Sequence, residues 1–323
     1  MAAKKKETKE KAKQLVNYSF KRALTRSFKK YWQLYLLLIP VIAYYILFKY
    51  MPMLGIQIAF KKYNMRDGIW GSQWIGFKHF IKFFKSYNFK TTLINTARIS
   101  FSALIFGFPA SVLIAILINE LRHNWSKKLV QTLTYAPHFL SVVVVVGLMT
   151  TMLSPSTGII NQLLLRFGIL NEPYYFTMHE GSFTPMYVLS GIWQNGGWGA
   201  IIYISALSGI DQEQYEAARV DGASRFQQLR YITIPGLVPT IITMLIINSG
   251  HILSVGYEKV FLMQNNANLM VSEVISTYVY RQGIESGNYS YSAAVGLFNS
   301  AINFAMLVIV NKICKSTTEN SLW

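Results

Sequence analysis

Acidic residues and cysteine are scarce in this sequence. Of 323 residues only 14 are Asp or Glu, against 31 Lys and Arg, and the formal net charge is +17. Charged residues make up 14%, whereas soluble domains carry roughly 25%. The basic residues crowd the first thirty positions and otherwise flank apolar runs. The charge therefore indicates a membrane surface rather than a nucleic acid.

Several chemical motifs are also missing. The single cysteine, Cys314, excludes an internal disulfide and a thiolate metal cluster. No Gly-Lys dipeptide occurs, so no Walker A loop is present to hold ATP phosphates. The five histidines form no HExxH or other close metal-ligand pair, and no GxSxG motif is found. We expect no catalytic residue, no metal site and no cofactor on this chain.

Long hydrophobic runs dominate what remains, at 52% hydrophobic residues. Six are long enough to cross a hydrocarbon core of roughly 30 Å, which takes about 20 helical residues. They lie near Trp32–Tyr50, Thr92–Ile118, Leu129–Leu153, Pro185–Leu207, Leu237–Tyr257 and Tyr291–Ile313. The first resembles a signal peptide but lacks a clean cleavage site, so we expect it to be retained. The sequence predicts an all-α membrane protein with six transmembrane helices.

The distribution of Lys and Arg predicts the orientation of these spans. With both termini in the cytoplasm, cytoplasmic segments hold 19 Lys and Arg and outer segments hold 10. Seven of the outer ones lie between Lys61 and Lys90, against the usual trend. We expect a basic cytoplasmic tail, residues 1–30, followed by one membrane domain, residues 31–323.

One short charged segment, YEAARVDGASRFQQLRYITIPGLVP (215–239), interrupts the apolar runs. Asp211 can cap a helix there, with Gln214 three positions later as in a capping box. Gly222 predicts a turn between two short helices, and Pro235 marks entry into the fifth span. The pattern fits either a solvated loop on lipid headgroups or a surface against which another protein packs.

This segment resembles the EAA loop of binding-protein-dependent ABC importer permeases. The matching positions are Glu216, Ala217, Ala218, Asp221, Gly222, Ala223, Ile232, Pro235 and Pro239. Asp211 stands where many relatives have proline, and Leu229 where many have an aromatic residue. The resemblance implies that residues 211–239 couple the chain to an ATPase subunit by docking in its groove.

The resemblance extends over most of the chain. WQLYLLLIPVIAYYILFKYMPMLGIQIAFKKYN, WIGFKHFIKFF, INQLL, LSGIWQNGGWGAIIYISALSGID, STYVYRQGI and AAVGLFNSAINF are similar to one branch of carbohydrate permeases, which serves oligosaccharides from complex polysaccharides (aldouronates, rhamnogalacturonan fragments and alginate oligomers). It implies a sugar-importer fold in a bacterial plasma membrane. The implied partners are a second homologous permease, two ATPase copies that bind ATP and Mg²⁺, and an extracellular solute-binding lipoprotein. The alternative is a stand-alone secondary transporter or channel, for which only Glu258 approaches a coupling carboxylate.

Polar groups inside spans are costly and mark a candidate sugar path. In GIWQNGGWGA, Trp193, Asn195 and Trp198 surround a Gly-Gly pair within the fourth span. Adjacent glycines predict an unwound or kinked helix that presents backbone groups to a sugar. The alternative is helix packing by small residues, with the tryptophans at the membrane interface.

Later spans add further candidates for the path. These are Asn248, His251, Tyr257, Glu258 and Asn299. Asn248, His251 and Ser254 recur about one turn apart and predict a polar line on one helix face. Hydrogen bonds within the protein are the alternative for each. Arg98 is expected to snorkel or to be paired, although a basic residue would suit a uronate.

Overall fold

The computed structural model describes residues 27–318 and 321–322, and most of them lie in helices. The chain divides between Gln57 and Ile58 into two compact units. The described part of the first unit is helical from Ser27, and includes a π turn, η1 (Ile46–Tyr50), and α2 (Met51–Met53). It passes into η2 (Leu54–Phe60) at the unit boundary. Most of the expected basic tail, residues 1–26, lies outside the described residues.

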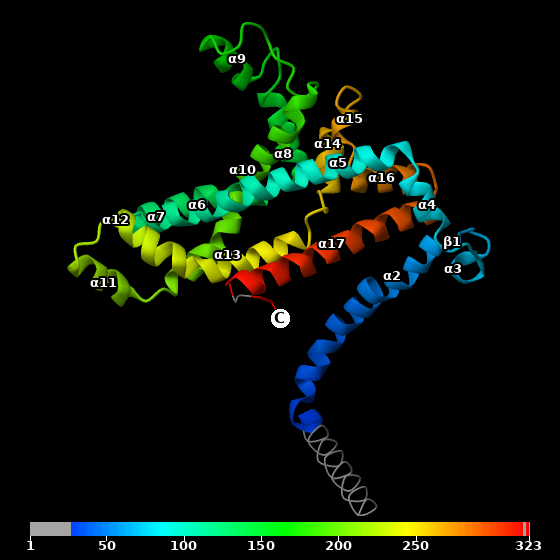
Figure 1. Cartoon of the computed structure of the whole chain (residues 1–323), viewed down its shortest axis with the longest axis horizontal. Coiled ribbons are helices and arrows are strands. Elements are labelled where there is room, and N and C mark those ends of the chain that lie inside the picture. Colours follow the sequence, from blue (N-terminus) through cyan, green and yellow to red (C-terminus); the bar gives the residue numbers. More distant parts are fainter. Residues whose placement is uncertain (1–26, 319–320, 323) are drawn as a thin grey trace, which may run out of the picture. The chain divides into compact units, whose positions relative to one another are not determined.

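The second unit contains one two-stranded hairpin and a set of helices (Figure 1). Strands β1 (Lys61–Lys62) and β2 (Gln73–Trp74) are antiparallel, with Lys61 opposite Trp74, and flank α3 (Gly68–Gly71). The following elements are α4 (Lys78–Phe84), α5 (Tyr87–Ser102), η3 (Ala103–Gly107), α6 (Phe108–Asn119), α7 (Asn124–Tyr135), η4 (Ala136–Phe139), α8 (Val142–Met152), α9 (Ile159–Arg166), α10 (Glu180–Ser208), α11 (Gln212–Val220), α12 (Arg225–Gln228), η5 (Leu229–Thr233), α13 (Ile234–Ser249), α14 (Tyr257–Met263), α15 (Leu269–Ser272), α16 (Ile275–Tyr280), η6 (Arg281–Glu285) and α17 (Tyr289–Thr318).

Within the described residues, four continuous helices are long and apolar enough to cross a membrane. They are Ser27–Phe60, Tyr87–Asn119, Arg225–Ser249 and Tyr289–Thr318, and they match the first, second, fifth and sixth predicted runs. The pair Asn124–Phe139 and Val142–Met152 could form a fifth span. Helix α10 is 29 residues long but falls outside this set. The mostly helical structure agrees with the prediction of an all-α membrane protein apart from the hairpin of β1 and β2, and the count of six spans and the cytoplasmic termini stay predictions.

The prediction of one continuous third span, Leu129–Leu153, is wrong. The helix breaks after η4, and the two halves meet at 101°. Pro137 lies in η4 and has no N–H to continue the ladder. Ser141 then caps the new helix α8 by accepting a hydrogen bond from Val144 N at 3.3 Å. The missing N–H of Pro137 and the helix cap at Ser141 therefore bend this segment.

The predicted end of the fifth span at Tyr257 is also wrong, because α13 ends at Ser249. A turn follows, and the buried Asn303 of α17 holds it. Its Oδ1 accepts from Leu253 N at 2.8 Å and its Nδ2 donates to Ser254 Oγ at 2.9 Å. One amide side chain thus satisfies backbone and hydroxyl groups that would otherwise lie unpaired in an apolar interior.

Three of the four π turns in the described residues precede a proline. The pairs are Ile46–Tyr50 with Pro52, Ala103–Gly107 with Pro109, and Leu229–Thr233 with Pro235. A proline inside a helix lacks an N–H and its ring crowds the carbonyl four residues earlier. A wider π turn moves that carbonyl aside without ending the helix. At Pro235 the helix consequently continues from Arg225 to Ser249.

Helix α10 packs closely against α6 and α7. It runs unbroken through Gly196 and Gly197, so the predicted unwinding is wrong and the packing alternative holds for these glycines. A Cβ on Gly197 would lie 2.2 Å from the carbonyl oxygen of Thr134, and one on Gly199 would lie 2.7 Å from Ser111 Oγ. Small residues let the backbones approach, as is common between membrane helices.

Polar side chains of α5 fasten the segment that contains α15 and α16. Asn95 Nδ2 donates to the carbonyls of Met270 at 2.9 Å and Glu273 at 3.1 Å. Arg98 Nη2 donates to the carbonyl of Val271 at 2.7 Å. Arg98 is therefore bonded within the protein and holds α15 in place.

The close contact at Gly197 predicts the effect of one added methyl group. We expect Gly197→Ala to destabilise the protein by about 1–3 kcal/mol, because the Cβ would overlap the Thr134 carbonyl. Gly296→Ala is the matched control, since a Cβ there meets nothing within 4 Å. Thermal unfolding in detergent measures both, and an unchanged midpoint for Gly197→Ala contradicts the packing argument.

Candidate functional site

The segment between α10 and α13 folds as a short helix, a bend and a second short helix, as predicted. Asp211 caps α11 by accepting from Glu213 N at 3.0 Å. The capping box forms at α12 instead, where Ser224 and Gln227 each accept from the other's backbone N–H. Gly222 lies between the helices with φ of +77°, a conformation that glycine adopts without strain.

This segment is anchored at its base. The Tyr215 hydroxyl lies 3.0 Å from Thr233 Oγ1, which connects α11 to the start of the long helix. Arg225 lies 3.9 Å from Glu120 at the end of α6, but both side chains are largely exposed and the pair adds little stability. The Tyr215–Thr233 hydrogen bond and the covalent link to the long helix therefore hold this segment in place more than the ion pair does.

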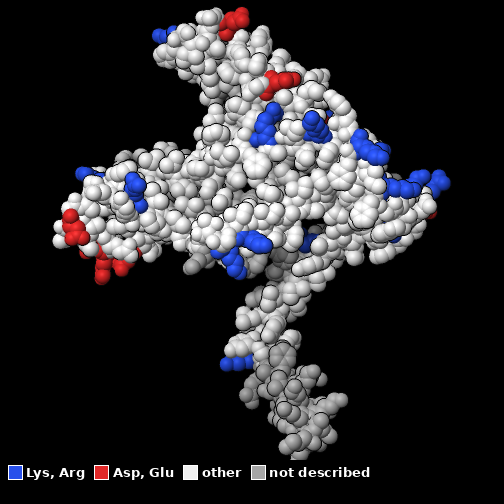
Figure 2. Space-filling model, in the orientation of Figure 1, with Lys and Arg blue, Asp and Glu red and all other residues white. Residues whose placement is uncertain are grey.

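The outer surface of this segment carries apolar and acidic side chains together. Val220 is 87% exposed and Phe226 is 69% exposed. The predicted coupling residues Glu216, Ala217, Asp221, Gly222 and Pro235 are exposed, and Ala218 and Ala223 are half-buried. Acidic residues gather at the end of the second unit that α11 and α12 form (Figure 2). Exposed apolar side chains rimmed by charge are typical of a surface that binds a protein.

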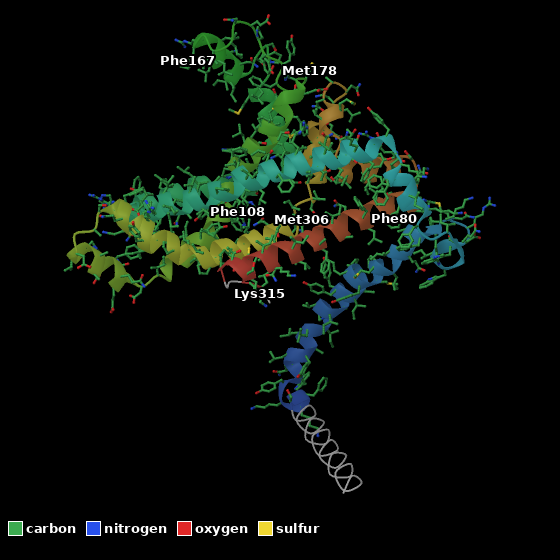
Figure 3. The ribbon with its side chains drawn as sticks, viewed as in Figure 1. Phe80, Phe108, Phe167, Met178, Met306 and Lys315 are labelled. Atoms are coloured by element: carbon green, nitrogen blue, oxygen red, sulfur yellow. The ribbon has the colours of Figure 1, made fainter. Side chains whose placement is uncertain are left out.

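A cavity of about 500 Å³ lies between α5, η3, α6, α10, the end of α13 and α14. Phe108, which begins α6 and is labelled in Figure 3, forms part of its apolar wall. The polar lining residues are Ser100, Ser111, Tyr187, Asn195, Tyr203, Asn248, His251, Ser254 and Lys259. An apolar cavity with a few convergent polar groups is the usual form of a small-molecule site.

Three of the eight predicted path residues line this cavity: Asn195, Asn248 and His251. The predicted polar line on one helix face is wrong, because His251 and Ser254 follow the end of α13. The turn held by Asn303 nevertheless brings both to the cavity beside Asn248. The geometry therefore unites these groups by a turn rather than by helical spacing.

The other five predicted path residues are not among the residues that line it. Trp193 is 50% exposed, and Glu258 is exposed on α14. Trp198 stacks on His138, with ring centroids 4.4 Å apart, and Tyr257 packs on Tyr280 at 4.8 Å. Asn299 is half-buried on α17, and its Oδ1 has no hydrogen-bond partner in the described part of the chain. A role for these five in the path stays a prediction.

Gln194 and His138 tie the bent third segment to α10. Gln194 is buried and donates to the carbonyl of Leu140 at 3.0 Å, at the point where the helix breaks. His138 Nδ1 lies 2.9 Å from Asn195 Oδ1. The polar residues of GIWQNGGWGA thus include a structural contact as well as the cavity wall.

Sequence reasoning missed Lys259, which it placed in an outer segment. The structure buries it to 8% exposure on the cavity wall. Its Nζ donates to the carbonyl of Tyr187 at 2.9 Å. Helix α14 lies outside the long apolar helices, and burial lowers the pKa of Lys259 to about 8. A lone lysine in the apolar stretch YEKVFLM was the one signal in the sequence.

Metal-binding side chains do not converge in residues 27–318 or 321–322, where no group of three His, Cys, Asp or Glu could hold an ion. The expectation of no metal and no cofactor on this chain was made from the sequence and stays a prediction.

The His138–Trp198 stack predicts a measurable coupling. His138→Ala and Trp198→Ala together should cost about 0.5–1.5 kcal/mol less than the sum of the single changes, because either change alone already removes the stack. Thermal unfolding of the four proteins measures it. Trp193→Ala replaces Trp198→Ala in the control cycle, where additive effects are expected. Additivity in both cycles would contradict the contribution of the stack.

Residues 91–317 match the family model described as binding-protein-dependent transport system inner membrane component. The chain is 42% identical over 290 residues to protein LplB of Bacillus subtilis, covering 90% of this chain and 91% of that protein. It is also 42% identical over 290 residues to the polygalacturonan/rhamnogalacturonan transport system permease protein YteP of Bacillus subtilis, and the match covers 90% of each chain.

Solved structures match over a similar length. A chain from the crystal structure of a bacterial ABC transporter involved in the import of the acidic polysaccharide alginate superposes with a TM-score of 0.83 at 39% identity. The match covers 91% of the present chain and 99% of that one. A second structure, of a bacterial alginate ABC transporter with an alginate pentasaccharide-bound periplasmic protein, matches at TM-score 0.83 and 38% identity, covering 92% and 99%.

Proposed function

Because this chain belongs to the family of binding-protein-dependent transport system inner membrane components, we propose that it forms half of an ATP-driven path for oligosaccharides cut from complex polysaccharides. It is a multi-pass protein of the bacterial plasma membrane and the permease component of a carbohydrate ABC importer. The observation that carries the substrate proposal is the cavity, whose amide and hydroxyl groups suit a polyhydroxylated ligand.

The relatives favour the same substrate class. YteP is described as a polygalacturonan and rhamnogalacturonan permease, and both matched transporter structures concern alginate. The names of these relatives therefore all refer to a polysaccharide or to a short oligosaccharide derived from one. We extend that class to the present chain because the identity covers the helices that line its cavity.

We place six spans in the membrane with both termini in the cytoplasm. The six are the four long helices, the bent pair as one span, and α10. Within the second unit, α7, α11 and α12 lie towards one end, and β1, α3 and α4 towards the other (Figure 1). This separation supports the placement of residues 211–239, called the EAA segment below, and of the β1–β2 hairpin on opposite sides of the membrane.

The EAA segment would dock in a groove of the ATPase subunit. Its exposed Val220 and Phe226 provide apolar contact, and Glu216 provides an acceptor for donors of the partner. The complete importer would contain a second homologous permease, two ATPase copies that bind ATP and Mg²⁺, and an extracellular solute-binding lipoprotein. The EAA segment then transmits motion between the ATPase and the spans.

Purification and transport test this function. The tagged chain should purify with one different permease and two ATPase subunits, and proteoliposomes containing that complex should take up oligosaccharide when ATP and the solute-binding protein are supplied. An ion gradient should not replace ATP. Uptake by this chain alone, driven by an ion gradient, would instead identify a secondary transporter.

The coupling segment makes a separate prediction. Glu216→Lys and Gly222→Pro should each weaken retention of the ATPase or its coupled uptake by at least about tenfold, while the spans stay inserted. Lysine places a cation where an acceptor is expected, and proline cannot adopt the φ of +77°. Co-purification and uptake assays measure the loss.

Matched controls separate coupling from general damage. Glu172→Lys reverses an exposed charge, and Gly168→Pro disturbs another glycine of positive φ, +69°, and both lie outside the EAA segment. Both controls should retain the ATPase. A cysteine at Ala218 or Ala223 should crosslink to the ATPase. Failure of both to crosslink, with free labelling in the assembled complex, contradicts docking.

A further inference from the structure

Lys259 is a buried cation without a carboxylate partner. It is 8% exposed, and in the described ranges no Asp or Glu forms an ion pair with its Nζ. Its protein contacts are the Tyr187 carbonyl at 2.9 Å and the face of the Tyr187 ring at 4.7 Å. A buried lysine usually lies beside a paired anion, because leaving water is costly for a charge.

The position of Lys259 makes it accessible to a molecule in the cavity. Lys259, Tyr187 and Gly191 all line that cavity. A Cβ on Gly191 would lie 3.4 Å from Lys259 Nζ, so the absence of a side chain there leaves the ammonium group uncovered on that side. Lys259 therefore lies in the wall of the space that a passing ligand would occupy.

The groups around Lys259 are neutral and polar. Asn248 Nδ2 donates to the Met244 carbonyl at 2.7 Å, which leaves the amide oxygen of Asn248 to accept hydrogen bonds from other donors. Asn195, His251 and Ser254 add further amide, imidazole and hydroxyl groups to the lining. One cation among neutral hydrogen-bonding groups suits a ligand with one carboxylate on each hydroxyl-bearing ring.

We infer that Lys259 binds a carboxylate of the transported oligosaccharide. This inference rests on the proposed function, since it requires the cavity to be part of a sugar path. Lys259 then determines specificity for acidic sugars, while Asn195, Asn248 and His251 serve their hydroxyl groups. The alternative is a structural lysine that only braces α14 against the Tyr187 carbonyl.

The test uses the assembled importer in proteoliposomes with its solute-binding protein. The probes are oligogalacturonate and an alginate oligosaccharide, each compared with its carboxyl-reduced, neutral counterpart of equal length. The wild-type complex should take up at least one acid form at least about tenfold more efficiently than its neutral counterpart. Lys259→Gln should lower that acid-to-neutral ratio by at least about tenfold, through loss of acid uptake alone.

Two further variants separate specificity from structure. Lys259→Arg keeps the charge and should retain most of the ratio, and Lys312→Gln, an exposed lysine of α17 outside the cavity, should leave it unchanged. The same solute-binding protein serves every variant, so a change in the ratio arises in the permease. Co-purification with the partner subunits shows that each variant assembles.

The outcomes distinguish the two proposals. Equal loss of acid and neutral uptake in Lys259→Gln, or no loss of either, overturns the role of Lys259. Uptake of neutral oligosaccharides alone also overturns it and leaves the proposed function standing. Uptake of no oligosaccharide by the wild-type complex contradicts the proposed function itself.

Discussion

The close approach of α10 to α6 and α7 is the contact on which the cavity depends. Gly197 and Gly199 bring the α10 backbone against Thr134 and Ser111, where any larger residue would hold the helices apart. That approach sets Asn195 beside the wall formed by α6. It also allows Gln194 to reach the Leu140 carbonyl at the break of the third segment. Glycine packing thus shapes the cavity and secures the bend together.

Amide side chains of the long helices then fix the short turns and helices around this core. Asn303 on α17 holds the turn after α13, and Asn95 on α5 holds the segment near α15. In an apolar interior each such turn exposes backbone groups that need partners. Because the turns are held, Lys259 on α14 reaches the cavity instead of the surface. The charge of the cavity therefore depends on contacts between distant parts of the sequence.

The sequence predicted two kinds of feature well: those that depend on hydropathy averaged over a long run, and those that depend on a few neighbouring residues. Long apolar runs predicted four helices, and the residues around Gly222 predicted the helix–bend–helix. Hydropathy windows failed at Ser141 and at the end of α13, because single capping and turn residues decide those points. They also gave no signal for Lys259, whose burial arises from tertiary packing.

The Gly-Gly pair in α10 shows why one motif supported two interpretations. Adjacent glycines lower helix stability and also permit close contact, and only the neighbouring backbone decides which effect prevails. Here the Thr134 carbonyl occupies the space of a side chain, and the helix remains intact. Of the path residues, Asn195, Asn248 and His251 reach the cavity, and the tryptophans lie outside its lining.

The central claim is that this cavity is part of the route taken by the sugar, and cysteine labelling tests it most directly. A cysteine is introduced as Asn248→Cys in a Cys314→Ser background, which removes the single native cysteine. In the assembled importer, ATP, solute-binding protein and a transported oligosaccharide together should slow its reaction with a thiol reagent severalfold. An exposed control, Lys312→Cys, should react at an unchanged rate. Unchanged labelling of Asn248→Cys while the same complex transports the sugar would contradict the account.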